Sequence, residues 1–188
     1  MQKTLILLVS MLLMSCITTT PAPDITYYLF DAEPIIHKEK TSRSLVELRE
    51  VKLPDYLSSN HLVMLDSGHV LIKANYHSWA DSLDEAMQRA LVNDLNNLSE
   101  DNAFVTWCES CKKNMSVGVT VEHFYPSIDG KLLLSGYFEI MGLQDENELT
   151  RFQLLSDLDS NGYANAVKQM RSQVRSLAER INAVIDKE

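Results

Sequence analysis

The chain has 188 residues, of which 45% are hydrophobic and 23% charged, and its formal net charge is −9. A chain of this length can bury a full core as one domain. Its acidic balance argues against a protein that holds nucleic acid or anionic lipid headgroups by charge, because both partners need a basic surface. We therefore expect no nucleic-acid partner.

The N-terminus has the pattern of a bacterial export signal. Lys3 precedes an uncharged apolar run over residues 4–14, which is about half of the roughly 20 residues that a membrane-spanning helix needs. The run ends in Leu-Met-Ser-Cys at residues 13–16, which resembles the lipobox of bacterial lipoproteins. The resemblance implies that the thiol of Cys16 receives lipid and that the chain is cleaved before it. The alternative is an ordinary cleaved signal with a chance cysteine.

Three segments follow from this signal. Residues 1–15 form the predicted signal peptide, residues 16–24 the acylated cysteine with a Thr- and Pro-rich tether, and residues 25–188 one folded domain. Position 17 is isoleucine rather than aspartate, which by resemblance to lipoprotein sorting signals favours the periplasmic face of the outer membrane. Two or more acyl chains would hold the protein stably on that membrane.

The domain alternates strand and helix patterns. The predicted strands are residues 25–30, 44–53, 61–65, 69–73, 115–125, 132–141 and 149–155, with short turns at residues 66–68 and 129–130. A capping box, with Ser82 at the N-cap and Glu85 three residues later, starts a helix whose apolar residues share one face. Residues 162–186 form a second long helix. The pattern predicts an α+β fold, a single two-layer sandwich of a mostly antiparallel sheet with helices packed on one face.

The last helix carries a narrow apolar seam. Its members are spaced alternately three and four residues apart: Val167, Met170, Val174, Leu177, Ile181 and Val184. We expect this seam to dock on the sheet. The alternative is contact with a neighbouring subunit, and the chain is therefore a possible homo-oligomer.

Several short stretches together resemble a known family. They are Tyr-Tyr-Leu at residues 27–29, Leu-Pro-Asp-Tyr-Leu at 53–57, Trp-Ala at 79–80 before a helix, Asp-Gly at 129–130 and Ser-Gly at 135–136. In this order, and with the lipobox, they resemble the ABC-type transport auxiliary lipoproteins, most closely the PqiC-like branch. The resemblance implies an outer-membrane lipoprotein that works with a periplasm-spanning MCE-domain protein in lipid transport between membranes and in envelope integrity.

Cys108 and Cys111 have the spacing of a redox pair or half a zinc site, and this stretch is not a feature expected of that branch. A zinc site needs four ligands, and His123 is the only further candidate nearby in the sequence. Because the predicted compartment is oxidising, we expect a local disulfide between the two cysteines. Metal binding and redox activity remain alternatives.

Other motifs are incomplete. Asp157, Asp159 and Asn161 resemble the start of a calcium-binding loop, but Lys168 stands where the bidentate glutamate should be. Ser110 and Lys113 match only part of a serine acyl-enzyme motif. The sequence therefore predicts no catalytic residues, no metal site and no cofactor, and we expect a protein that is not an enzyme.

Two function classes remain open. The first is a noncatalytic accessory subunit of an MCE-type lipid transport system, which docks through exposed aromatic residues; the candidates are Tyr56, Trp79 and Tyr137, each of which could equally belong to the core. The second is a stand-alone periplasmic lipoprotein that binds a small apolar ligand or lipid.

Overall fold

A computed structural model describes residues 21–30, 44–107, 115–142, 147–159 and 162–186. Its main element is a five-stranded sheet with the order β5, β2, β6, β7, β8. The strands are β2 (Ser44–Lys52), β5 (Asn102–Val105), β6 (Met115–Pro126), β7 (Lys131–Met141) and β8 (Asn147–Asp157). The central strand β6 is antiparallel to β7 and parallel to β2, while β5 pairs parallel to β2.

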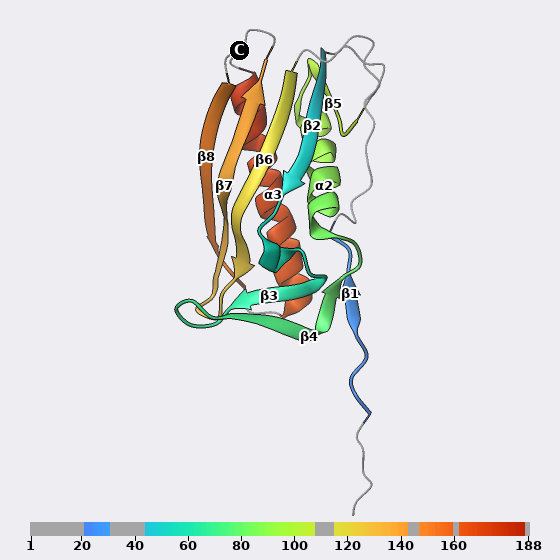
Figure 1. Cartoon of the computed structure of the whole chain (residues 1–188), viewed down its shortest axis with the longest axis vertical. Helices are drawn as coiled ribbons and strands as arrows, with labels where there is room; N and C mark the ends of the chain where they lie inside the picture. Colours follow the sequence, from blue (N-terminus) through green and yellow to red (C-terminus); the bar gives the residue numbers. More distant parts are fainter. Residues whose placement is uncertain (1–20, 31–43, 108–114, 143–146, 160–161, 187–188) are drawn as a thin grey trace, which may run out of the picture.

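A smaller sheet crosses one end of the larger one (Figure 1). It contains β1 (Thr26–Tyr28), β4 (Leu71–Trp79) and β3 (His61–Leu65), in that order. β3 and β4 form an antiparallel hairpin, and β1 adds to β4 in parallel. A short 3-10 helix, η1 (Asp55–Leu57), connects β2 to this sheet. The described N-terminal residues leave the molecule from this same end.

Two helices cover one face of the five-stranded sheet and leave the other face open (Figure 1). They are α2 (Leu83–Leu98) and α3 (Tyr163–Ile185). Alternation along β6 and β7 points every second side chain at the helices. Those side chains form the buried core: Val117, Val119, Val121, Leu132, Leu134, Phe138 and Ile140. Within the described residues, neither helix is both long enough and apolar enough to cross a bilayer.

The predicted α+β class, with helices on one sheet face, is confirmed. The two longest ladders, β6–β7 and β7–β8, are antiparallel, as the predicted hairpins require. The structure differs in having two sheets, both mixed, rather than one. It also adds the strand β5, which the sequence pattern did not indicate.

α3 agrees to within a residue at each end with the helix predicted over residues 162–186, α2 begins directly after the predicted N-cap Ser82, and the apolar seam of α3 docks on the sheet as expected. Val174, Leu177 and Ile181 are fully buried. The capping prediction at α2 is correct only for the backbone: Ser82 is the N-cap, but its side chain makes no capping hydrogen bond. The backbone carbonyl of Ser82 instead accepts a hydrogen bond from the N–H of Ala86 at 3.1 Å.

Candidate functional site

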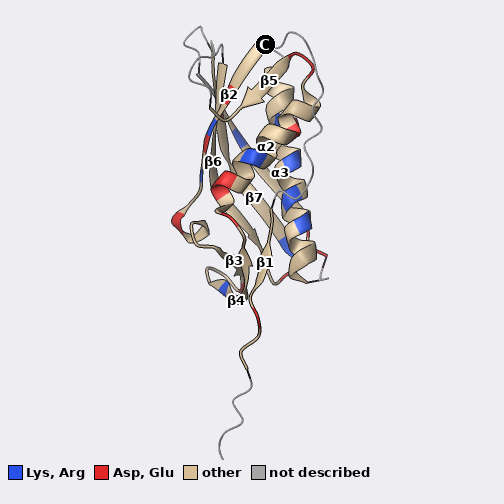
Figure 2. Ribbon diagram, turned by 90° about the vertical axis from the view of Figure 1, so that its right-hand side faces the viewer, with Lys and Arg blue, Asp and Glu red and all other residues tan. Residues whose placement is uncertain are grey.

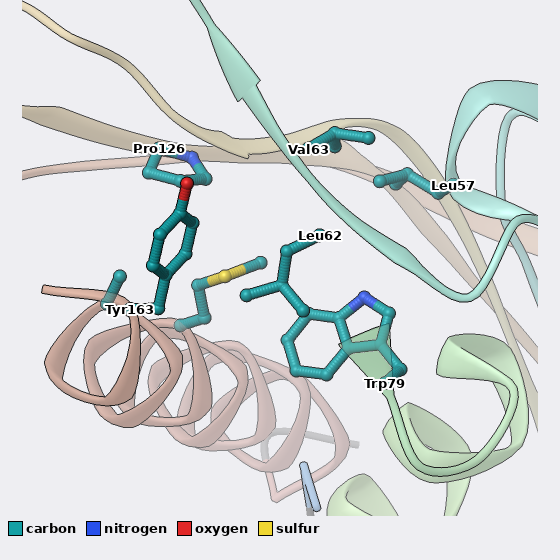
Figure 3. A pocket seen from close by; sticks show the side chains of 8 residues that line it. Leu57, Leu62, Val63, Trp79, Pro126 and Tyr163 are labelled. Atoms are coloured by element: carbon teal, nitrogen blue, oxygen red, sulfur yellow. The ribbon is translucent and has the colours of Figure 1, made fainter. Parts of the chain in front are cut away.

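Trp79 belongs to the core. Its side chain is 3% exposed and its indole meets Phe30 edge to face, with ring centroids 5.5 Å apart. It lines a small apolar cavity of about 10 Å³ between η1, β3 and α3, together with Leu62 and Met170 (Figure 3). A cavity of that volume holds at most one water molecule, so it is not a ligand site. The sequence left open whether Trp79 is a docking residue or a core residue, and the structure places it in the core.

Tyr56 is half-buried and makes an internal contact. β2 pairs with β6 only as far as Thr120. Beyond that point the edge of β6 that faces β2 has no partner strand, and the backbone N–H of Phe124 lies in this unpaired part. The hydroxyl of Tyr56 accepts this N–H at 3.3 Å and so ties η1 to β6. The pKa of Tyr56 is raised above its ordinary value, mainly because the side chain is buried. The hydrogen bond from Phe124 acts in the opposite direction, and the nearby Tyr125 adds a smaller increase. The hydroxyl of Tyr56 therefore has a structural role.

Tyr137 lies on the open face of the five-stranded sheet. Its neighbours Gly136 and Phe138 on β7 are buried on the helix side, so alternation turns the Tyr137 ring away from the helices. The guanidinium carbon of Arg151 on β8 stands 5.9 Å from the ring centroid. Arg151 continues across β7 to the carboxylate of Glu122 on β6, at 3.2 Å. The tyrosine thus forms part of a row that joins three strands.

A second row crosses the other half of the same face. Arg49 on β2 reaches Glu139 on β7 at 3.5 Å, with β6 between them. Gly118 on β6 makes this possible, because a Cβ there would lie 2.4 Å from the Arg49 guanidinium. We call this surface the open face and define it by Arg49, Gly118, Glu122, Tyr137, Glu139 and Arg151. In both rows the two opposite charges lie on strands that are separated by a third strand, and each pair spans that strand across the open face.

The helical side of the molecule has a different character. Figure 2 shows Lys and Arg positions along α3, and Lys168, Arg175 and Arg180 are exposed there. Arg171 on the same helix is instead buried, and it binds Asp94 on α2. The open face, with a central aromatic ring beside paired charges, therefore differs from the surface of α3, where these three basic side chains are exposed.

The remaining candidate residues lie elsewhere. Cys16, Cys108 and Cys111 are outside the described residues. Asp157, from the calcium-like motif, pairs with Lys131 Nζ at 2.5 Å, and the hydrogen bond from Lys131 holds the pKa of the carboxyl below its ordinary value. Within the described ranges, no three His, Cys, Asp or Glu side chains gather as a metal site would require.

A model of the ABC-type transport auxiliary lipoprotein component family matches residues 27–182. The chain belongs to this family. The match begins in β1 and ends in the last turn of α3, so it includes all or most of every described strand and of both helices. The resemblance inferred from the short sequence stretches is thereby confirmed.

This family member is 28% identical over 128 residues to the intermembrane transport lipoprotein PqiC of Escherichia coli (strain K12). PqiC of Shigella flexneri matches with the same identity. The alignment covers 66% of this chain and 65% of the relative, so the chain spans just under two thirds of the length of the curated relatives.

Two crystal structures share the fold. An uncharacterized protein superimposes with a TM-score of 0.77 at 23% identity, covering 87% of this chain and 99% of that protein. Protein XCC0632 from Xanthomonas campestris gives a TM-score of 0.63 at 11% identity, covering 86% and 90% of the two chains. At these identities the likeness concerns the fold alone.

Sequence reasoning selected Tyr137 but not the arginines and glutamates around it. The alternation along β7 could have indicated the position of Tyr137, because it places this residue on the opposite face of the strand from the buried Leu134 and Phe138. The partners of Tyr137 depend on the registers of β6 and β8 and on a bulge between Val121 and His123. A single sequence does not specify those registers.

Proposed function

We propose that this chain is an outer-membrane lipoprotein, anchored through lipid on Cys16, that acts as a noncatalytic accessory subunit of an MCE-type intermembrane lipid transport system and helps to maintain envelope integrity. The observation that carries the proposal is the family match over residues 27–182. The name of the Escherichia coli relative, an intermembrane transport lipoprotein, supports the transport role.

The open face is the surface through which we expect the domain to dock a periplasm-spanning MCE-domain protein. Tyrosine and arginine are enriched among residues that dominate binding energy at protein interfaces. Here Glu122 pairs with Arg151, and Arg151 in turn stands over the Tyr137 ring, so part of the side-chain ordering that binding requires is already present. This preorganisation favours Tyr137 over Tyr56, whose hydroxyl is engaged inside the domain.

The test is site-specific photo-crosslinking in cells. A crosslinking amino acid replaces Tyr137 in one strain and Arg175, which is exposed on the helical side, in the matched control. We expect position 137 to capture an MCE-domain protein and position 175 to capture none.

A second measurement separates docking from folding. Tyr137→Ala should weaken the recovery of the MCE-domain protein from envelope extract without lowering the melting temperature by more than a few degrees, because its ring is only partly buried and lies outside the core. If neither crosslinking nor pull-down of the native protein recovers an MCE-domain protein, the accessory role gives way to a stand-alone lipoprotein that binds a small apolar ligand or lipid.

A further inference from the structure

Exposed apolar side chains are concentrated at the end of the molecule that carries the small sheet. Of the ten large apolar residues exposed within the described part of the chain, seven lie on or beside this sheet: Leu29, which follows β1 and lines a cavity beside α3, and six others. We call these six the tether-end patch: Ile25, Tyr27, Val70, Ile72, Tyr76 and Ile128. Their exposed fractions run from 40% for Tyr76 to 64% for Tyr27. Monomeric proteins rarely gather exposed apolar residues in this way without a contact to cover them.

Backbone pairing connects the segments that carry the patch. Tyr27 on β1 is the ladder partner of Ser78 on β4. The turn that contains Val70 is closed by the hydrogen bond from the Asp66 N–H to the Val70 carbonyl at 2.8 Å. Ile128, between β6 and β7, donates its N–H to the Leu65 carbonyl at the end of β3. The six residues therefore belong to one continuous piece of structure.

The position of Cys16 brings this piece close to a membrane. Four residues separate Cys16 from Pro21, the first described residue, so the five Cα–Cα steps between them reach at most about 18 Å when fully extended. The described chain from residue 21 leaves the molecule beside β1, β3 and β4, whereas the end of β7 and the C-terminus lie at the opposite end (Figure 1). A lipid on Cys16 would therefore keep the small sheet, and not the far end, on the side of the domain nearer to the bilayer.

The chemistry of the patch fits a lipid surface. Lys73 is the only Lys or Arg in residues 61–79, a fully described range, so the β3–β4 hairpin offers no basic cluster to anionic headgroups. The tether-end patch itself consists of four aliphatic side chains and two tyrosines, with exposed polar residues such as Ser67, His69 and Asn75 between them. Tyrosine favours the membrane–water boundary, because its ring is apolar and its hydroxyl remains hydrated. Contact would thus rest on apolar burial rather than on charge.

We propose that the tether-end patch contacts the lipid surface directly, so that the domain stands on the membrane on its small sheet with its long axis pointing away. The inference rests on the proposed anchoring at Cys16. It adds a second membrane contact and a fixed orientation: the open face stands sideways to the membrane, and the ends of β7 and α3 project into the periplasm.

Two tryptophan variants of the full-length lipidated protein test the orientation. Val70→Trp places a reporter in the patch. Leu149→Trp places one at the start of β8, at the opposite end; the two native side chains are similarly exposed, at 54% and 55%. Each protein is reconstituted on vesicles of phosphatidylethanolamine and phosphatidylglycerol, with and without bromine on the acyl chains. Trp79 and Trp107 contribute equally to both variants and to the parent, so the difference from the parent isolates the added reporter.

We expect the emission added at position 70 to shift to shorter wavelength and to be quenched by the brominated chains, and the emission added at position 149 to do neither. Equal quenching at both positions, or none at position 70 on vesicle-bound protein, overturns the orientation. In that case a protein partner or a second copy covers the patch. If the parent protein carries no fatty acid and stays in the supernatant, the anchoring itself fails. That outcome overturns the inference together with the proposed localisation and is distinguishable from the first two.

Discussion

The guanidinium of Arg171 on α3 binds the carboxylate of Asp94 on α2 through two hydrogen bonds of 2.6 and 2.9 Å, and both side chains are almost fully buried. This bidentate pair links the two helices inside the layer that covers the sheet. Two parallel hydrogen bonds between a guanidinium and a carboxylate require one relative orientation of the two groups, whereas apolar packing alone tolerates several. It therefore fixes how α2 lies against α3.

The first prediction concerns this pair. Asp94→Ala leaves the Arg171 guanidinium buried without its carboxylate and should lower the free energy of unfolding by about 3–5 kcal/mol. The control is Asp81→Ala, which removes the partner of Arg89 at the same distance of 2.6 Å but with both side chains nearly half exposed. That change should cost at most about 1 kcal/mol. Chemical denaturation measures both, and equal losses would contradict the dependence on burial.

The second prediction compares two glycines on neighbouring strands. A Cβ at Gly136 would lie 2.1 Å from the backbone carbonyl oxygen of Thr120, so Gly136→Ala forces β6 and β7 apart and should cost about 3 kcal/mol or more. A Cβ at Gly118 would meet only the flexible guanidinium of Arg49. Gly118→Ala should therefore displace Arg49 from Glu139 and cost less than about 1 kcal/mol.

Thermal unfolding of the two alanine variants measures the contrast. The structural reading of Gly136 is wrong if Gly136→Ala unfolds at the temperature of the parent protein. Gly118→Ala is the matched control, since it adds the same methyl group to the adjacent strand.

The third prediction concerns anchoring. Cys16→Ala removes the thiol to which the lipid is expected to be attached, so the protein should no longer incorporate a tagged fatty acid and should leave the membrane fraction. Cys108→Ala serves as the control, because it removes a thiol that the lipobox does not involve. Label that persists on Cys16→Ala would exclude this residue as the lipidation site.

The fourth prediction concerns Cys108 and Cys111. In protein extracted under native conditions we expect the two sulfurs to be bonded to each other, so neither should react with an alkylating reagent until a reductant is added. The loop that this bond closes is short, and chain entropy gives it a stabilisation of only about 2 kcal/mol. Mass spectrometry of the alkylated peptide is the measurement, and full reaction of both thiols before reduction would favour a metal-bound or reduced pair.

Local signals made most of the fold predictable. The alternation of β6 and β7, the turns around Gly68 and Gly130, and the helical period of α3 each act over a few residues, and a single sequence displays them directly. The strand β5 has only four residues and pairs in parallel with β2. In the sequence β2 precedes α2, whereas β5 follows it. Its stability comes from that distant pairing, so its own sequence contains little sign of it.

The docking candidates were harder to assign for a related reason. Trp79, Tyr56 and Tyr137 are all large aromatic residues beside turns or in strands, and residue type does not distinguish a core ring from a surface ring. Burial of Trp79 arises where η1, β3 and α3 converge, and the exposure of Tyr137 depends on which face the helices cover. Both are properties of the assembled layers.

The position of β2 in the larger sheet sets an order of assembly. β6, β7 and β8 follow one another along the chain and pair as consecutive hairpins, whereas β2 finds its partners only among strands that come after α2. Pairs that close short loops form faster than pairs that close long ones. Pulse-labelled hydrogen exchange during refolding should therefore protect the β6–β8 amides before those of β2. Although the polypeptide is built from its N-terminus, the larger sheet thus becomes structured from its C-terminal strands, and β2, which is made before any of them, is the strand that waits for its partners.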